Sequence, residues 1–121
     1  SPTGALVAIL PCNDLDASER FYARLGFARP DGERPVGEED SYRMLSNGQG
    51  GYLHLIDAVE GWLVPPKPFA LYLYLEDVDA AAHEFQQIPE DKPWGIYEFA
   101  ISDPDETLVR VGWPSRLRLG K

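Results

Sequence analysis

The chain has one cysteine, little positive charge and no long apolar run. Of its 121 residues only Cys12 is a cysteine, which excludes a disulfide within the chain and predicts a buried free thiol in the first loop. No apolar run approaches the roughly 20 residues that span a bilayer, and no basic-then-apolar leader precedes Ser1. We therefore expect a soluble, cytoplasmic protein with no membrane partner.

The charge is strongly one-sided. Eleven basic residues against twenty acidic ones leave a net charge of −9, and such a field repels nucleic-acid phosphates and anionic lipid. The same field attracts a cationic small molecule, although carboxylates in loops also serve solubility alone. Composition thus excludes nucleic acid as a partner and favours a cationic ligand.

An internal repeat organises the sequence. Twice, an apolar stretch runs into an Asp-apolar-Asp-Ala turn and then into a helix-forming run, and the two copies begin near Leu6 and Leu71. A chain of this length forms one domain that buries about two thirds of its unfolded surface. We expect a single domain over 1–121, with module one at about 4–57, a linker at about 58–68 and module two at about 69–114.

The first module reads as a strand, a helix and a hairpin. Residues 6–10 form an apolar run that predicts a strand buried on both faces and closed by Pro11. Asp14 or Asp16 can cap the helix that follows, and Gly26 can end it. Residues 41–45 and 51–56 predict a hairpin, whereas residues 30–39 suggest a mobile loop or a weak strand.

The second module repeats this order in shortened form. Residues 69–75 alternate between leucine and tyrosine or alanine, which predicts a strand with its leucines facing a helix at 79–87. Strands at 96–101 and 107–111 are predicted around a tight turn at Asp103-Pro104-Asp105. About six residues separate the helix from Trp94.

These motifs resemble the vicinal oxygen chelate superfamily of glyoxalases, bleomycin resistance proteins and dioxygenases. The resemblance is carried by Asn13-Asp14-Leu15-Asp16, Phe21-Tyr22-Ala23-Arg24-Leu25-Gly26-Phe27, Trp94-Gly95 and the hairpin 103–110. Within the superfamily the chain looks most like the bleomycin resistance proteins. The resemblance implies an α+β fold of two βαβββ modules, whose curved mixed sheets enclose a cleft, in a homodimer. Glu106 departs from the pattern, because the family usually carries glycine there.

The resemblance also implies where a metal would bind in the enzymes of the superfamily. Those positions hold Val7, Ala70 and Arg110 here, and neither an apolar side chain nor a permanently cationic guanidinium binds a metal ion. His54 alone does not make a site, since catalytic zinc needs three protein ligands. We therefore expect no cofactor and favour a non-enzymatic role, with His54 as a general base the remaining catalytic hypothesis.

Strand alternation predicts which side chains would face a ligand in the implied cleft. Aromatic rings with a few polar groups suit a flat, partly charged organic molecule, although Glu98 and Arg110 can equally pair across the sheet. Trp113 is expected to fill the core or a dimer interface. The predicted ligand-binding residues are His54, Asp57, Trp62, Tyr72, Tyr74, Trp94, Glu98 and Arg110.

Three functions stay open at this point. The first is a metal-free protein that sequesters a cationic aromatic antibiotic of the bleomycin type without chemical change. The second is a metal-dependent glyoxalase-like lyase or extradiol-type dioxygenase, and the third is binding of another metabolite or of a protein partner, which the shortened second module favours. The missing donor atoms at Val7, Ala70 and Arg110 favour the first.

Overall fold

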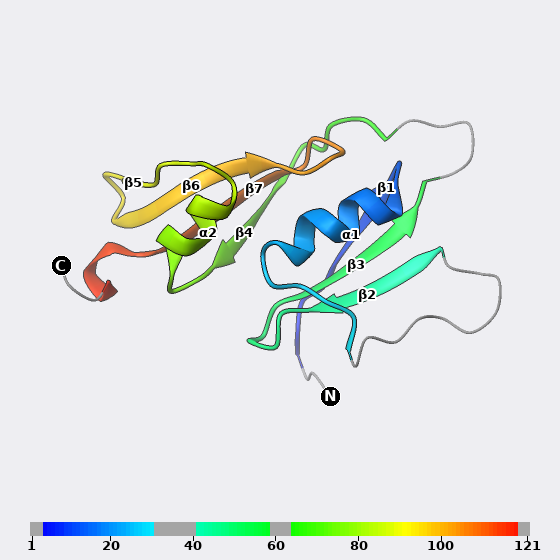
Figure 1. Ribbon diagram of the computed structural model, residues 1–121, viewed down its shortest axis with the longest axis horizontal. Helices are drawn as coiled ribbons and strands as arrows, with labels where there is room; N and C mark the ends of the chain where they lie inside the picture. Colours follow the sequence, from blue (N-terminus) through cyan, green and yellow to red (C-terminus); the bar gives the residue numbers. More distant parts are fainter. Residues whose placement is uncertain (1–3, 31–40, 59–63, 119–121) are drawn as a thin grey trace. The chain divides into compact units, whose positions relative to one another are not determined.

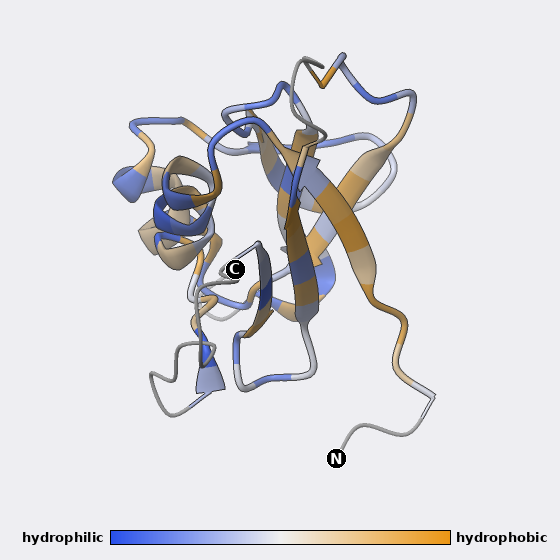
Figure 2. Ribbon diagram, turned by 90° about the vertical axis from the view of Figure 1, so that its right-hand side faces the viewer, coloured by the Kyte–Doolittle hydropathy of each residue, from blue (hydrophilic) through white to orange (hydrophobic). Residues whose placement is uncertain are grey.

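A computed structural model describes residues 4–30, 41–58 and 64–118 (Figure 1). The chain divides into two compact units, 1–65 and 66–121. Hydrophobic residues recur along the strands of both units (Figure 2). No helix among the described residues has the length and apolar character needed to cross a membrane.

The first unit is a three-stranded sheet with one helix. Its elements are β1 (Ala8–Cys12), α1 (Leu15–Ala23), β2 (Tyr42–Ser46) and β3 (Tyr52–Asp57). The strand order is β1-β3-β2, with β1 parallel and β2 antiparallel to β3. The predicted hairpin is confirmed to within one residue at each end. The predicted weak strand or loop at 30–39 lies almost wholly outside the described residues.

Strand β1 differs from its prediction. It continues through Pro11 to Cys12, and only one of its faces is buried, because Leu10 is 1% exposed while Ile9 is 55% exposed. Strand β1 lies at the edge of the sheet, where a proline without an N–H group is tolerated. Cys12 is a buried free thiol as expected, but it ends the strand instead of lying in a loop.

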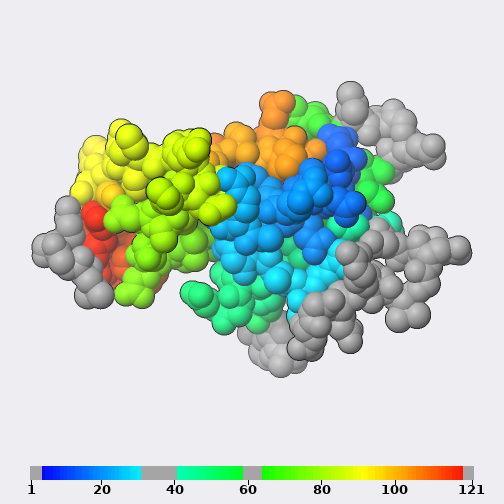
Figure 3. Space-filling model, in the orientation of Figure 1, coloured from blue at the N-terminus to red at the C-terminus, as the bar shows by residue number. Residues whose placement is uncertain are grey.

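Helix α1 begins and ends where its sequence signals are. The Asp14 carboxylate accepts a hydrogen bond from the Ala17 N–H at 3.0 Å, which makes Asp14 the N-cap. Gly26 has a φ of +95°, a left-handed conformation that favours glycine after a helix. Tyr22 and Leu25 are buried, whereas the outer side of α1 forms part of the surface (Figure 3).

The second unit has the complete βαβββ order. Its elements are β4 (Ala70–Tyr74), α2 (Val78–Glu84), β5 (Glu90–Asp91), β6 (Ile96–Ser102) and β7 (Leu108–Pro114), followed by the 3-10 turn η2 (Ser115–Leu117). The strand order is β4-β7-β6-β5, with β4 parallel to β7. The predicted α+β class with two modules is therefore confirmed.

Two boundaries in the second unit differ from the prediction by more than one residue. Helix α2 ends at Glu84 instead of Gln87, because Gln86 adopts a φ of 56° and the Gln87 N–H bonds back to the Ala82 carbonyl. Strand β7 continues three residues beyond Val111, since its pairing with β6 extends to Pro114.

The turn between β6 and β7 holds a glutamate in a conformation that usually needs glycine. Glu106 has a φ of 63°. The Asp103 Oδ1 atom accepts hydrogen bonds from the N–H groups of Asp105 and Thr107 at 2.9 and 2.8 Å. These bonds hold the turn, so Glu106 remains left-handed despite its side chain.

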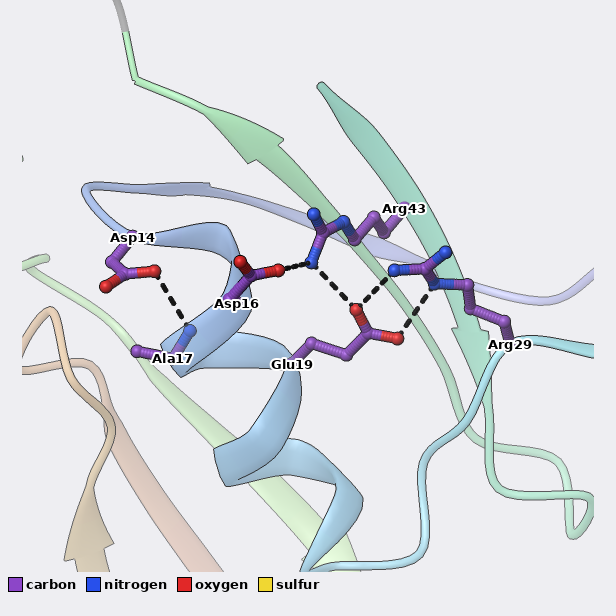
Figure 4. Close-up of polar contacts among 6 residues, drawn as sticks. All are labelled: Asp14, Asp16, Ala17, Glu19, Arg29 and Arg43. Atoms are coloured by element: carbon purple, nitrogen blue, oxygen red, sulfur yellow. Dashed lines mark hydrogen bonds and ion pairs between the residues drawn. The ribbon is translucent and has the colours of Figure 1, made fainter. Parts of the chain in front are cut away.

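A buried arginine joins the hairpin of the first unit to its helix (Figure 4). Arg43, 6% exposed, points from β2 toward α1 and bonds to Asp16 and Glu19, each at 2.8 Å. Arg29 donates two further bonds to Glu19, at 2.8 and 2.7 Å. The hydrogen bond from Arg29 is the main reason that the pKa of Glu19 lies below its ordinary value of 4.5, against the opposing effect of burial. Glu19 therefore binds two segments of the unit at once.

Replacing Glu106 with glycine should stabilise the protein. A left-handed conformation costs a residue with a side chain about 1–2 kcal/mol. Glycine avoids this cost, but it loses more conformational entropy on folding, which reduces the net gain. We expect Glu106→Gly to raise the free energy of unfolding by about 0.5–1 kcal/mol, measured by urea denaturation. Glu106→Ala, which keeps the left-handed cost, is the matched control. An equal gain in both variants would contradict the explanation.

Replacing Glu19 with glutamine should destabilise the first unit and weaken its response to acid. The loss of charged hydrogen bonds to Arg43 and Arg29 should cost about 2 kcal/mol. Because the pKa of Glu19 is lowered in the folded state, its contribution is fully present above pH 4.5 and is lost as the pH falls through the lowered value.

Urea titrations of wild type and Glu19→Gln between pH 3 and 7 check this expectation. The difference in unfolding free energy should be largest at neutral pH and should shrink below pH 4.5. A constant difference across that range would show that the charge of Glu19 is not responsible. Glu76→Gln, at an exposed position between β4 and α2, provides the control.

Candidate ligand-binding face

One face of the second unit's sheet is open and aromatic. Tyr97, on β6, donates a hydrogen bond to Asp79 of α2, so the next residue, Glu98, lies on the opposite face. On β4, Tyr72 and Tyr74 share that face and are 40% and 56% exposed, with ring centroids 4.9 Å apart. We call this surface, made of Tyr72, Tyr74, Glu98, Arg110 and Gly112, the tyrosine face.

A buried carboxylate organises the tyrosine face. Glu98 is 2% exposed, and each of its oxygens has a partner. The Tyr72 hydroxyl donates to Oε1 at 2.6 Å, and the Arg110 guanidinium donates to Oε2 at 3.2 Å. The pairing between Glu98 and Arg110 that the sequence allowed is therefore present.

Gly112 makes the contact between Tyr72 and Glu98 possible. Strand β7 lies between β4 and β6, so Tyr72 must reach over the backbone of β7. A Cβ atom on Gly112 would stand 2.5 Å from the Tyr72 hydroxyl and 2.8 Å from the Glu98 Cβ atom. Because Gly112 has no side chain, Tyr72 on β4 can cross β7 and donate a hydrogen bond to Glu98 on β6.

The tyrosine face keeps Tyr72 neutral. Burial is the largest cause that raises the pKa of Tyr72 well above its ordinary value of 10, and its hydrogen bond to Glu98 acts in the same direction. The phenol therefore remains a hydrogen-bond donor at all physiological pH values. Glu98 is held by a donor that does not titrate under these conditions.

The second unit has two tryptophans, Trp94 and Trp113, in different environments. Trp94, predicted as a ligand residue, is 64% exposed in the turn between β5 and β6. Trp113, predicted as core or interface filler, is partly buried and meets Tyr74 edge to face at a centroid distance of 6.5 Å.

The first unit also has an open sheet face, opposite α1. His54 lies there and shares a hydrogen bond of 2.7 Å between its Nδ1 atom and the Tyr42 hydroxyl. Asp57 ends β3 and is exposed. Neighbouring apolar residues include Ile9, Met44 and Ile56, which are 55%, 59% and 37% exposed. The sequence analysis missed Tyr42 and Met44 on this face, although the alternation of residues 42–46 signals them. The predicted ligand residue Trp62 lies outside the described residues.

The structure offers no group of metal ligands within the described residues. Nowhere in 4–30, 41–58 and 64–118 do three or more His, Cys, Asp or Glu side chains gather so that they could hold an ion. At the positions implied by the resemblance, Arg110 is engaged with Glu98. The side chains at these positions do not fit a metal ion.

Comparison with known proteins identifies the fold. Residues 5–111 match the sequence profile of the "Glyoxalase/Bleomycin resistance protein/Dioxygenase superfamily". Comparison with curated proteins finds no match.

Several solved structures are similar to this chain. A bleomycin-binding protein in complex with bleomycin is 24% identical, with a TM-score of 0.67 over 92% of this chain and 98% of the other. The bleomycin resistance determinant encoded on the transposon Tn5 is 25% identical, with a TM-score of 0.70 over 93% and 98%. TnmS3, an antibiotic-binding protein from Streptomyces sp. CB03234, is 22% identical, with a TM-score of 0.69 over 95% and 98%.

Removing the Tyr72 hydroxyl should destabilise the second unit. In Tyr72→Phe the Oε1 atom of Glu98 loses its protein donor while its side chain stays buried, and an unsatisfied buried acceptor costs about 1–3 kcal/mol. Thermal and urea unfolding measure this loss. Tyr74→Phe removes a hydroxyl from the adjacent ring and should change stability by less than about 0.5 kcal/mol. Equal effects of the two variants would contradict the assigned hydrogen bond.

Proposed function

This chain belongs to the glyoxalase/bleomycin resistance protein/dioxygenase superfamily, and on that premise we propose that it binds an aromatic antibiotic of the bleomycin type and sequesters it without chemical change. The observation that carries the proposal is the tyrosine face, a pair of exposed rings beside a buried, fully paired carboxylate. Rings held by such a network present a preformed platform for a planar ligand. Sequestration requires binding alone.

The nature of the ligand is supported from two sides. Similar structures include proteins described as bleomycin-binding and antibiotic-binding. The net charge of −9 attracts a molecule whose overall charge is positive, which supports the cationic ligand expected from the sequence. The same expectation assigns contacts to His54, Asp57, Trp62 and Trp94, and these remain predictions.

We further propose a homodimer with ligand clefts, in which the open face of the first unit is covered. On the first unit, Ile9, Met44 and Ile56 expose apolar area on one sheet face. Adjacent apolar groups of this kind mark binding or interaction surfaces, and a symmetric dimer would cover two copies at once. The dimer and the cytoplasmic location stay predictions; analytical ultracentrifugation tests the first.

The residues do not favour the metal-dependent alternative. Arg110 occupies a position that the resemblance assigns to a metal ligand, and its guanidinium is paired with Glu98. Metal analysis of protein purified without chelator, followed by lyase and dioxygenase assays with added metal, tests this alternative. Half an equivalent or more of bound metal together with turnover would replace the binding proposal.

Titration with bleomycin tests the proposal directly. Saturable quenching of tryptophan fluorescence, at about one ligand per chain, is the expected result for both metal-free and copper-loaded bleomycin. Loss of an exposed ring should remove about 0.5–1.5 kcal/mol of stacking, so Tyr74→Ser should weaken binding by about 2- to 10-fold. Tyr74→Phe, which keeps the ring, should bind like wild type.

A control variant and a survival assay complete this test. Tyr97→Phe alters the opposite face of the same sheet, where Tyr97 bonds to Asp79, and should leave affinity unchanged. Expression of wild type, but not of Tyr74→Ser at limiting levels, should raise survival on bleomycin. Absence of saturable binding by wild type would refute the bleomycin assignment.

A further inference from the structure

The charge that the tyrosine face presents to a ligand comes from Arg110. The Arg110 side chain is 43% exposed, whereas that of Glu98 is 2% exposed. Both oxygens of Glu98 are engaged, by Tyr72 and by Arg110. The carboxylate thus lies beneath the surface while its cationic partner reaches solvent.

Arg110 retains capacity for another partner. A guanidinium has five N–H donors arranged for two parallel bonds to an oxyanion, and the bond to Glu98 uses one of them. Among the residues that the structure describes, Arg110 makes no other hydrogen bond or ion pair. Its remaining donors are therefore available at the exposed side of the face.

The position of Arg110 places these donors beside the aromatic rings. Arg110 is the register partner of Tyr72 on the neighbouring strand, and the Tyr74 ring contacts that of Tyr72 at an interplanar angle of 40°. The other charged pair on this side of the sheet, Glu90 with Lys92 at 2.9 Å, belongs to β5 and its end. Strand β6 lies between it and β7, so it is at least two strand spacings, about 10 Å, from Arg110, and its two charges offset each other.

We infer that the tyrosine face takes an aromatic group that carries an acidic substituent, such as a carboxylate, sulfonate or phenolate, with the rings over Tyr72 and Tyr74 and the oxyanion on Arg110. This inference rests on the proposed function, because it assumes that the ligand lies on this face. It narrows that function to ligands whose aromatic part carries an acidic group, even where the molecule as a whole is cationic. The net charge of −9 acts on the ligand as a whole at long range, while Arg110 selects the group beside the rings.

A matched pair of fluorescent probes tests the inference on the whole chain. 8-Anilinonaphthalene-1-sulfonate and N-phenyl-1-naphthylamine differ by one sulfonate group. A charge-assisted contact with Arg110 should make wild type bind the sulfonate at least about 10-fold more tightly. The cation 1-naphthylmethylammonium, used as a competitor of the neutral probe, should bind more weakly than either.

Variants of Arg110 assign the effect to this face. Removing Arg110 alone would leave Glu98 buried with an unpaired charge, so the double variant Glu98→Gln/Arg110→Gln is used, with folding checked by circular dichroism. In the double variant the sulfonate preference should fall to below about 2-fold while the affinity for the neutral probe is retained. Glu98→Gln alone frees Arg110 and should keep or increase the preference.

The outcomes separate this inference from the proposed function. Equal binding of the two probes by wild type, or a preference that survives in the double variant, overturns the role of Arg110. If bleomycin binding still depends on Tyr74, as judged by Tyr74→Ser, the binding proposal stands in that case. Tighter binding of the cation overturns the inference alone. Absence of saturable binding of bleomycin and of both probes by wild type overturns the inference and the proposed function.

Discussion

The buried carboxylate of Glu98 is the feature on which the second unit's open face depends. A carboxylate that is 2% exposed must be fully satisfied, and its two donors come from two other strands, Tyr72 on β4 and Arg110 on β7. The contact holds one ring of the aromatic platform in place and ties three strands together on one side of the sheet. The position of the Tyr72 ring therefore depends on the same hydrogen bonds that satisfy Glu98.

This arrangement depends in turn on an absent side chain. Tyr72 reaches Glu98 only across β7, and Gly112 is the point at which it crosses. Any Cβ atom there would stand closer to the Tyr72 hydroxyl than real contacts allow. The glycine thus acts in packing, without any need for an unusual backbone conformation.

The first unit also has a buried charged side chain, on the face of its sheet that packs against α1. Arg43 occupies a core position of β2. Glu19 accepts hydrogen bonds from both Arg43 and Arg29. The sheet is thereby fastened to α1 by charged hydrogen bonds, which leaves the opposite face free for His54 and its apolar neighbours. Each unit commits one face of its sheet to its helix and presents the other.

The sequence by itself determined the local elements, because their signals are local: the Asp14 cap, the glycine after α1, the alternation of Leu71 to Tyr74 and the turn at Asp103. It also placed Tyr72, Tyr74, Glu98 and Arg110 on one face, since strand periodicity does so without any tertiary information. It misjudged β1, because Ile9 lies on the open face of the sheet, opposite α1. Only the tertiary structure decided that Glu98 is buried beneath an exposed Arg110 and that Gly112 lets Tyr72 cross a strand. Burial and reach depend on which strands become neighbours, and no local pattern in the chain encodes that.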